Sequence, residues 1–590
     1  MKKIAKFLIV LGMMGQLSSC DYLDIVPDER AQESDTWKTE GAVRGYLYSC
    51  YGYLPANRTF GNSYWLAEEL TAVTKELFTT FKYGYYSPVS LGFTSNTWST
   101  IWNGIHQCYM FQESLKQVSN EYVTDEMKKQ YLAESNFLIA YYHFLSMRSY
   151  GPTMIIRSVI DLETPISGFP ERSSIDEVVA FINEKLDEAM SEGGLPTTWS
   201  GKDYGRATRL AALALKSRVY LYAASPLYNG NTEMYADFRS PLDGRQLIAQ
   251  EKSQAKWEIS ATQTKYAIDE VEKAKFHLYH DADAGEPSDA KPGLPNKAQR
   301  RLRYTNIDNQ TGNNPEIIWA DTRNDDYYGI QRRCPPRQTL GGKFAGISMT
   351  NCPTLQTIEA FYTKNGLPIN KDKTFDYDER YEYISAPENC DGNNYEDLVK
   401  YANFTPSSDK VMRLCTDREP RFYAWTTYHN GYFEFGKYNN EEISADPAKR
   451  AIRIHLLRDD PHGRGNRTDQ EYSISGFGNK KGVVPSAEWN VIEYPFPLFR
   501  LAELYLNYAE ALVELDRLSE AKVYLDKVRE RAGIPSVDEA WDKYSTNPGY
   551  QNTQEGMREI VRAERMNELY LEGHKSVSYT HLTLPTILRV

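Results

Sequence analysis

Cysteine is scarce in this chain: its 590 residues include seven cysteines, and they are widely spaced. None of them forms a CxxC pair, so the sequence indicates neither a zinc site nor a dense disulfide framework. Basic residues are also in the minority, since 68 Lys and Arg stand against 80 Asp and Glu, for a net charge of −12. An acidic surface of this kind argues against non-specific binding to nucleic acid.

The common catalytic motifs are missing as well. The sequence has no HExxH, GxSxG or Walker A motif, and its nine histidines are scattered. The acidic group Asp281, Asp283 and Glu286 lacks the spacing of an EF-hand calcium loop. We therefore expect no cofactor, no metal ion and no enzymatic activity. A glycosidase needs only two carboxylates across a cleft, so a hydrolase stays open as an alternative.

Long apolar runs are rare, and the clearest one lies at the N-terminus. A lysine-rich start precedes the apolar stretch Phe7–Leu17, which is shorter than the ~20 residues that a membrane-spanning helix needs. The sequence Leu-Ser-Ser-Cys that follows, ending at Cys20, resembles a bacterial lipobox. We predict a lipoprotein signal peptide over residues 1–19 and a mature chain anchored to the outer membrane by lipids on Cys20, facing outward. The alternative is an ordinary signal peptide, cut near a small residue.

Aromatic residues, in contrast, are abundant. The chain has 44 tyrosines and 10 tryptophans. Many of them must lie in the core, but so many rings also provide flat apolar surfaces. Such surfaces suit stacking against sugar rings.

The clearest helical pattern is Pro497–Pro535. Leucine, tyrosine and alanine recur there at three- and four-residue spacing, in two successive blocks. Asp516 and Arg517 form a short turn between the blocks, and Gly533 followed by Pro535 ends the second one. We predict an αα-hairpin of the kind that stacks in tetratricopeptide-like arrays.

Helical periodicity recurs through the first half of the chain. Ser174 and Glu177 have the spacing of a capping box before one of these helices. The last four of these helices and the Pro497–Pro535 hairpin make three pairs, separated by unequal insertions. The predicted helices are Gly41–Tyr53, Trp98–Val118, Glu126–Tyr150, Ile175–Ala189, Arg206–Ala224 and Lys256–Phe276.

Residues 281–495 have a different composition, rich in Gly, Pro, Asn and Asp, with short apolar runs such as Ile317–Trp319. We predict a loop-dominated subdomain here, with a few short strands and one helix near Thr354–Tyr362. It would separate an N-terminal region, 20–280, from a C-terminal helical region, 496–575. Long structured loops on a rigid scaffold commonly carry function.

Several blocks of sequence occur in a characteristic order. They are the lipobox with DYLDIVPDE, FLIAYYHFLSMRSYGP, GRATRLAALALKSRVYLYAASPLYN, NPEIIWA, PTLQTIEAFYTKNGLPI, REPRFYAW and PLFRLAELYLNYAEAL. Any one of them is a weak signal, but the ordered set runs through most of the chain. In this set the chain resembles the SusD/RagB family, surface lipoproteins of nutrient uptake in Bacteroidetes.

The resemblance implies a mainly α fold, with a scaffold of four tetratricopeptide-like helix pairs and the loop-rich subdomain. It also implies capture of oligosaccharides and their delivery to a TonB-dependent, SusC-like outer-membrane transporter. A peptide ligand, as in RagB, is the alternative. One departure is Ser576–Val590, which lacks the family's character after the last family helix, Glu559–Lys575. We expect this tail not to be native.

No family motif fixes the ligand-binding residues, so the candidates rest on composition and position. Aromatic rings offer a pyranose a flat apolar partner, and Asn, Asp and Arg side chains match its hydroxyls. Packing of each tyrosine under its own loop is the alternative. The first candidate cluster is Trp65, Phe81, Tyr83, Tyr85 and Tyr86. The second follows the NPEIIWA block and comprises Arg323, Asn324, Asp325, Tyr327, Tyr328, Gln331 and Arg332.

Three functions therefore stay open: a glycan-binding protein, a surface hydrolase, and a purely structural lid for a transporter. Turnover of oligosaccharide would identify the hydrolase. Loss of glycan binding on aromatic-to-alanine substitution would distinguish the binding protein from the lid.

Overall fold

The structure is a computed structural model that describes residues 37–55, 69–72, 93–161, 163–288, 297–308, 314–323, 329–336, 349–385, 410–434, 451–460, 462–465, 472–485 and 492–575. The predicted signal peptide, Cys20 and the tail 576–590 lie outside these residues.

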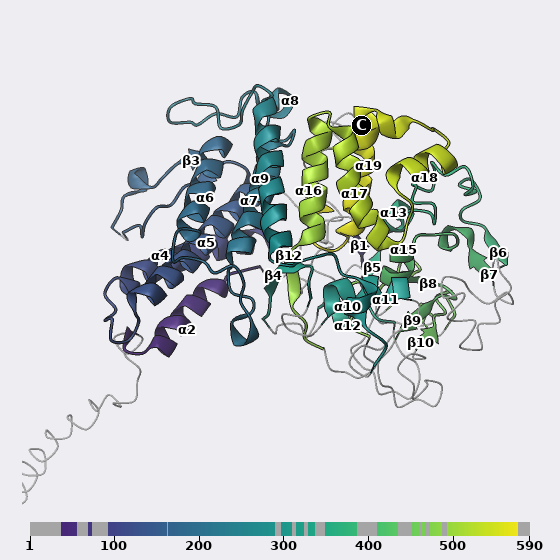
Figure 1. Ribbon diagram of the computed structural model, residues 1–590, viewed down its shortest axis with the longest axis horizontal. Helices are drawn as coiled ribbons and strands as arrows, with labels where there is room; N and C mark the ends of the chain where they lie inside the picture. The colour runs from purple at the N-terminus through teal and green to yellow at the C-terminus, as the bar shows by residue number, and fades with distance from the viewer. Residues whose placement is uncertain are drawn as a thin grey trace, which may run out of the picture.

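Helices dominate the described chain (Figure 1). The long ones are α2 (Glu40–Tyr51), α4 (Phe93–Leu115), α5 (Asp125–Tyr150), α6 (Ile175–Ala189), α7 (Arg209–Ala224), α9 (Gln254–Lys273), α16 (Leu501–Glu514), α17 (Leu518–Ala532) and α19 (Gln554–Glu568). The shorter ones are α8 (Thr232–Tyr235), α10 (Asp281–Ala284), α11 (Lys297–Ile307), α12 (Ile330–Arg333), α13 (Leu355–Ala360), α15 (Pro420–Trp425) and α18 (Val537–Tyr544). The predicted mainly α fold is therefore confirmed.

Local sequence signals account for where several helices begin and end. The capping box predicted before α6 is present: the Ser174 hydroxyl accepts the Glu177 N–H, and the Glu177 carboxylate accepts the Ser174 N–H at 2.7 Å. The predicted turn between α16 and α17 contains Asp516 with a φ of 59°. Gly533 ends α17 in the left-handed region, with a φ of 79°.

The long helices pack in a continuous stack. Each of α4, α5, α6, α7, α9, α16 and α17 packs against the next, and α19 packs on α16. Figure 1 shows α9 standing beside α16, although the whole loop-rich segment separates them in sequence. One hydrophobic core runs through the stack, so it is the rigid part of the molecule.

A close approach between helices occurs where α4 crosses α5. A Cβ atom added at Gly104 would lie 2.9 Å from the Tyr142 ring and 2.9 Å from the Tyr53 Cβ. Real Cβ atoms do not approach carbon atoms so closely, so the helix needs glycine at this position. The Tyr142 hydroxyl also donates to the Cys50 carbonyl at 2.5 Å, which joins α5 to α2.

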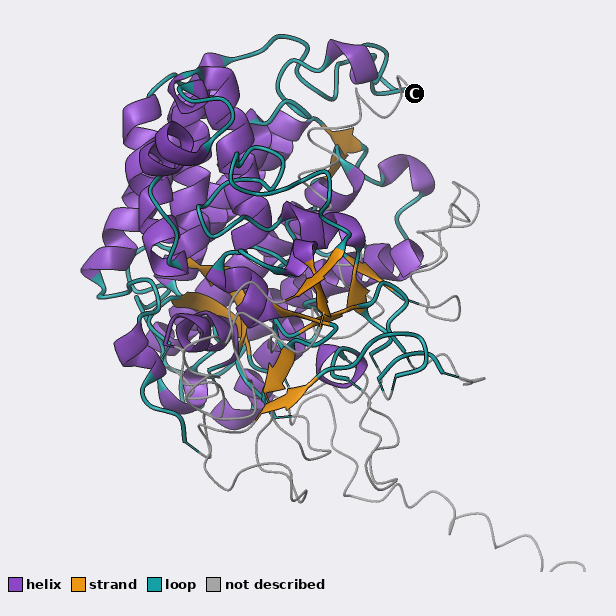
Figure 2. Cartoon of the chain, turned by 90° about the vertical axis from the view of Figure 1, so that its right-hand side faces the viewer, coloured by secondary structure: helices purple, strands orange, loops and turns teal. Residues whose placement is uncertain are grey.

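The described strands are short and pair in antiparallel couples: β1–β5, β2–β3, β4–β12, β6–β7, β8–β11 and β9–β10. In Figure 2 they are short arrows beside a much larger mass of helices. Their bounds are β1 Leu70–Thr71, β2 Thr153–Met154, β3 Arg172–Ser173, β4 Ile317–Asp321, β5 Cys352–Pro353, β6 Tyr383–Ser385, β7 Lys410–Met412, β8 Thr426–Tyr428, β9 Tyr432–Glu434, β10 Ala451–Arg453, β11 Phe477–Asn479 and β12 Phe496–Arg500. Most of them lie between α9 and α16 in sequence, in the segment that forms a second, smaller hydrophobic core.

The loop-rich segment contains more helix than the single one predicted near Thr354–Tyr362, which corresponds to α13. Helices α11 and α15 were missed because their buried faces carry charged residues. Arg303 in α11, 5% exposed, donates to the carbonyls of Val483 and Ala424. Helix α19 also ends at Glu568 rather than at Lys575, and Leu571 beyond it has a φ of 59°.

Among the described residues, no helix combines the length and the apolar character needed to span a membrane.

Candidate functional site

Most of the predicted ligand residues lie outside the described part of the chain. This holds for Trp65, Phe81, Tyr83, Tyr85, Tyr86, Asn324, Asp325, Tyr327 and Tyr328. Arg323 is described at the end of the segment that contains β4. Gln331 and Arg332 are nearly buried in α12, where the Gln331 amide donates to the Ile492 carbonyl at 2.9 Å. The contacts of these described residues therefore show where the candidate loops begin.

Arg323 joins the end of the β4 segment to the turn after α2. Its guanidinium donates to the carbonyls of Leu54 at 2.9 Å and Pro55 at 3.0 Å. It also forms a bidentate pair with Asp321, with N–O distances of 2.9 and 2.7 Å. Residue 55 precedes the stretch that contains Trp65, and residue 323 precedes Asn324–Tyr328. The stretch that contains Trp65 and the stretch Asn324–Tyr328 therefore start from one place on the scaffold, and Arg323 holds it together.

The first stretch is fixed again at Glu69, just before β1. The Glu69 carbonyl accepts the Thr354 N–H at 3.1 Å, and its carboxylate accepts the Leu571 N–H at 3.2 Å. The Glu69 side chain is 1% exposed, and burial raises the pKa of its carboxyl to about 7, although Lys575 opposes the shift. Glu69 is thus a buried anchor between the two halves of the aromatic stretch.

A pocket of about 270 Å³ opens beside β4. Its walls combine aromatic rings with hydroxyl and amide groups. They are formed by Thr197, Thr198, Trp199, Ser200, Tyr204, Gly205, Arg206, Thr208, Phe276, Asn314, Ile317, Ile318, Trp319 and Ala320. Trp199 and Tyr204 are partly exposed, and burial raises the pKa of Tyr204 to about 12. Among the described residues, none shares a hydrogen bond with the Tyr204 hydroxyl, so this group can serve a ligand.

The pocket lies next to the Arg323 contact. The Trp319 indole N–H donates to the Gly205 carbonyl at 2.9 Å. Gly205 has a φ of 98°, and a Cβ atom there would lie 2.8 Å from the Thr322 side chain. Glycine is therefore required where the loop before α7 meets the end of β4. Gly205 in the pocket wall consequently contacts Thr322, the residue before Arg323.

A buried ion pair stiffens the pocket wall next to Gly205. Glu134 in α5 is fully buried and accepts hydrogen bonds from Arg206 and from the Tyr51 hydroxyl, the latter at 2.6 Å. The Arg206 guanidinium also lies 4.2 Å from the centre of the Trp199 ring. Arg206 also donates to Asp203 at 2.7 Å, and the Trp199 indole N–H donates to the Ala207 carbonyl at 2.9 Å. The Trp199 ring therefore has a fixed position before any ligand arrives.

The lining of this pocket has side chains of the kinds that bind sugars. Aromatic rings can stack on a pyranose, and Thr, Ser, Tyr and Asn side chains can exchange hydrogen bonds with its hydroxyls. Hydrolysis of a glycosidic bond requires two carboxylates flanking the bond. Among the described residues that line the pocket there is no Asp or Glu.

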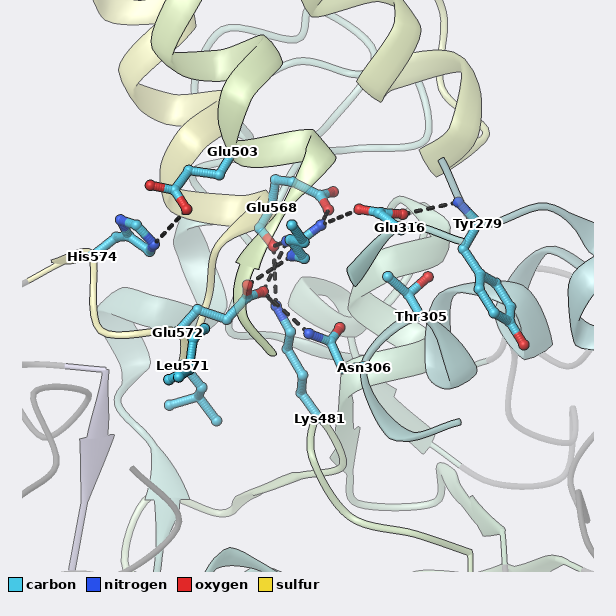
Figure 3. A network of polar contacts seen from close by, with 12 residues as sticks. Tyr279, Thr305, Asn306, Glu316, Lys481, Glu503, Glu568, Leu571, Glu572 and His574 are labelled. Carbon is cyan, nitrogen blue, oxygen red and sulfur yellow. Dashed lines mark hydrogen bonds and ion pairs between the residues drawn. The ribbon is translucent and has the colours of Figure 1, made fainter. Parts of the chain in front are cut away.

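A second set of contacts fastens the loop-rich segment to the helical stack. Arg500, at the start of α16, donates to Glu316 and Glu568 at 2.7 Å each and to Glu572 at 2.7 Å. Figure 3 shows Glu316 converging with Glu568 and Glu572, which lie at and just after the end of α19, and Lys481 reaching Glu572 from below. Arg531 also contacts Glu568. The network thereby fixes β4, and with it the pocket, relative to the helices.

The charged residues of this network lie in the sequence blocks that carry the resemblance to the SusD/RagB family. Glu316 lies in NPEIIWA, Arg421 in REPRFYAW, Arg500 in PLFRLAEL, and Glu568 in the last helix. Burial alone would raise the pKa of Glu568, but Arg531, Arg500 and Arg421 together hold it well below its ordinary value. The charged residues of these blocks thus meet in one buried network, which hydrophobic periodicity alone does not predict.

Trp199 and Tyr204 were not predicted as ligand residues. The signal that could have found them is a pair of aromatic residues in the Gly- and Ser-containing stretch WSGKDYG, just before a helix. Trp319 lies within the NPEIIWA block, but it is 2% exposed and forms the floor of the pocket.

Comparison with known proteins gives a consistent picture. The profile described as "SusD family" matches residues 315–577, and the profile described as "Starch-binding associating with outer membrane" matches residues 21–221. No protein with a curated description matches the chain.

Solved structures agree with the profiles. The protein BT4246 is 27% identical, with a TM-score of 0.74 over 92% of this chain and 89% of its own. A SusD-like protein of Bacteroides fragilis, BF3747, is 20% identical, with a TM-score of 0.65 over 94% of this chain and 88% of its own. A laminarin-binding SusD-like protein shares the fold at 16% identity, with a TM-score of 0.51 and 92% of each chain covered. The chain therefore belongs to the SusD family.

Proposed function

We propose that this protein is a lipid-anchored surface protein that captures oligosaccharides and delivers them to a TonB-dependent outer-membrane transporter. One observation carries the proposal: in a member of the SusD family, a pocket lined by aromatic rings and hydroxyl groups lies beside β4, near the start of the candidate stretch Asn324–Tyr328. The laminarin-binding relative and the description of the N-terminal profile both support a carbohydrate ligand and the outer membrane.

The anchoring part of the proposal rests on the lipobox at Cys20. Two acyl chains give stable attachment to a membrane, whereas one chain is marginal. The transporter part rests on family membership. An affinity pull-down from native membranes in mild detergent should recover a large barrel protein with the lipoprotein. Repeated recovery of the lipoprotein alone would count against the partner.

The ligand should bind with modest affinity. A stacking contact contributes roughly 1 kcal/mol beyond its buried area. A few such contacts with some hydrogen bonds correspond to dissociation constants from about millimolar to about micromolar. The entropy lost on binding should be small because Trp199 and the Arg323 contact with Pro55 are already fixed.

The test is calorimetry of the purified chain against a panel of plant, host and microbial polysaccharides, followed by chromatography of each glycan that binds. We expect at least one glycan to bind and to be recovered intact. Release of shorter products would identify a hydrolase. Binding of peptides without binding of any glycan would establish the RagB-like alternative.

A further inference from the structure

A group of metal-binding side chains lies in the loop-rich segment, outside the aromatic pocket. It consists of His429, His455 and Asp460. One ring nitrogen of each histidine and one carboxylate oxygen of Asp460 all lie within 4.8 Å of one another. All three residues are partly buried, so the ligand atoms are held by the protein and still accessible to an ion from solvent.

Backbone pairing, and not proximity in sequence, brings these residues together. His429 lies in the turn between β8 and β9, and His455 and Asp460 follow β10, which pairs with β9. The Asn430 N–H donates to the Ile454 carbonyl at 2.7 Å, and the Ile454 N–H donates to the Gly431 carbonyl at 2.8 Å. The turn and the loop are therefore fixed against each other before any ion binds.

Two of the ligand atoms already have the spacing of a bound ion. His429 Nδ1 and Asp460 Oδ2 are 3.4 Å apart. Two ligands of one tetrahedral ion, each about 2.1 Å from it, lie about 3.4 Å apart. Asp460 Oδ2 accepts the Leu457 N–H at 2.9 Å and keeps a second lone pair for an ion. His429 Nδ1 accepts the Leu456 N–H at 3.1 Å, so an ion bound at this nitrogen would replace that hydrogen bond.

His462 supports the third ligand. Its ring stacks on that of His455, with centroids 6.3 Å apart and planes at 14°. Its Nδ1 also accepts the His455 N–H at 3.0 Å. These contacts limit the orientations of the His455 ring, which is the usual role of residues that surround metal ligands.

We propose that His429, His455 and Asp460 bind a Zn²⁺ ion. Two imidazoles and one carboxylate are a typical ligand set for zinc with three protein ligands, and they leave a fourth position for water. Calcium and magnesium prefer all-oxygen sites, so the two histidines argue against them. The bound ion would join the β8–β9 turn to the loop after β10. This inference does not depend on the proposed glycan ligand.

The test uses the full chain without a polyhistidine tag, treated with a chelator and titrated with zinc chloride at neutral pH by calorimetry. We expect one zinc ion per chain, reversal by EDTA and a higher melting temperature with zinc. Substitution of a ligand (His429→Ala, His455→Ala or Asp460→Asn) should weaken zinc binding at least about tenfold. The Asp460→Asn variant keeps the side-chain volume, so it separates loss of a ligand from loss of the fold.

The chain offers a matched control. His277 and His280 stack with centroids 5.3 Å apart, and His277 lies 3.4 Å from Asp283, so this group has the same composition. His277→Ala should leave zinc binding unchanged. The proposal is overturned if no stoichiometric zinc binds, if all three ligand variants bind zinc like the parent, or if His277→Ala abolishes binding.

Discussion

At the scale of single residues, Glu568 tests the buried network. It is fully buried and pairs with Arg531, Arg500 and Arg421. Glu568→Gln would remove a carboxylate that these guanidinium groups share and leave the buried network one negative charge short, so we expect a loss of roughly 3–5 kcal/mol in the free energy of unfolding. Urea denaturation measures the loss. The control is Glu184→Gln, which removes an exposed pair with Arg157 and should cost no more than about 1 kcal/mol.

Glu568→Gln should also change how the stability of the protein depends on pH. The pKa of Glu568 is depressed in the folded state, so its contribution to stability is present above its unfolded pKa and is lost as the pH falls below about 4. The parent should therefore lose stability on acidification more steeply than Glu568→Gln. Parallel acid-denaturation slopes in the two proteins would contradict this role.

Glu69 should change the pH dependence of stability in the opposite direction. Burial raises its pKa to about 7, so the folded state binds a proton more tightly than the unfolded state does. Its contribution to stability is fully present below the unfolded pKa of about 4.3 and is lost as the pH rises through about 7. Relative to the parent, Glu69→Gln should gain roughly 2 kcal/mol between pH values of about 5 and about 8. Stability curves with the same pH dependence would show that Glu69 titrates normally.

At the scale of secondary-structure elements, Gly104 tests the contact between α4 and α5. Gly104→Ala improves helix propensity by about 1 kcal/mol but forces a methyl group against Tyr142 and Tyr53. We expect a net destabilisation of about 1–2 kcal/mol, measured by thermal melting. Gly45→Ala in α2, where nothing lies within 4 Å, should instead stabilise by about 0.5–1 kcal/mol. Equal effects at the two positions would refute the close contact.

The sequence predicts the long helices correctly because their apolar residues recur at three- and four-residue spacing. In α16 and α17 the pattern, the turn at Asp516 and the stop at Gly533 all agree with the structure. Helices α11 and α15 are not predicted because Arg303 and Arg421 are buried and bind partners more than 100 residues away, Ala424 and Glu568. A prediction from hydrophobic periodicity places such charged residues on the protein surface.

The candidate site also depends on long-range contacts that local sequence patterns do not reveal. Composition identifies aromatic-rich stretches, but it cannot show that Arg323 brings the starts of two of them together. The pocket beside β4 depends on Gly205 meeting Thr322, a contact that no local pattern encodes. The His429 group escapes notice for a similar reason, since its members come from two loops and match no metal-binding spacing.

At the scale of the whole molecule, anchoring is tested at Cys20. Cys20→Ala removes the site of lipidation, so we expect the protein to be released from the membrane or to stay unprocessed. Fractionation of cells with immunoblotting measures this. Cys50→Ala is the matched control because Cys50 is buried in the core, and that variant should stay with the membrane. Unchanged membrane retention of the Cys20 variant would exclude a lipid anchor there.

The most direct test of the account is to map glycan binding by calorimetry. Any glycan that binds the parent is titrated into Tyr83→Ala, Tyr86→Ala, Tyr204→Ala, Tyr327→Ala and Tyr328→Ala, with Tyr122→Ala as a control on an exposed tyrosine elsewhere. The account predicts that Tyr204→Ala and at least one of the loop variants bind about fivefold more weakly or worse, since each lost stacking contact is worth roughly 1 kcal/mol. Tyr122→Ala should bind like the parent. If all five variants also bind the glycan as tightly as the parent, the ligand does not bind at this face of the molecule.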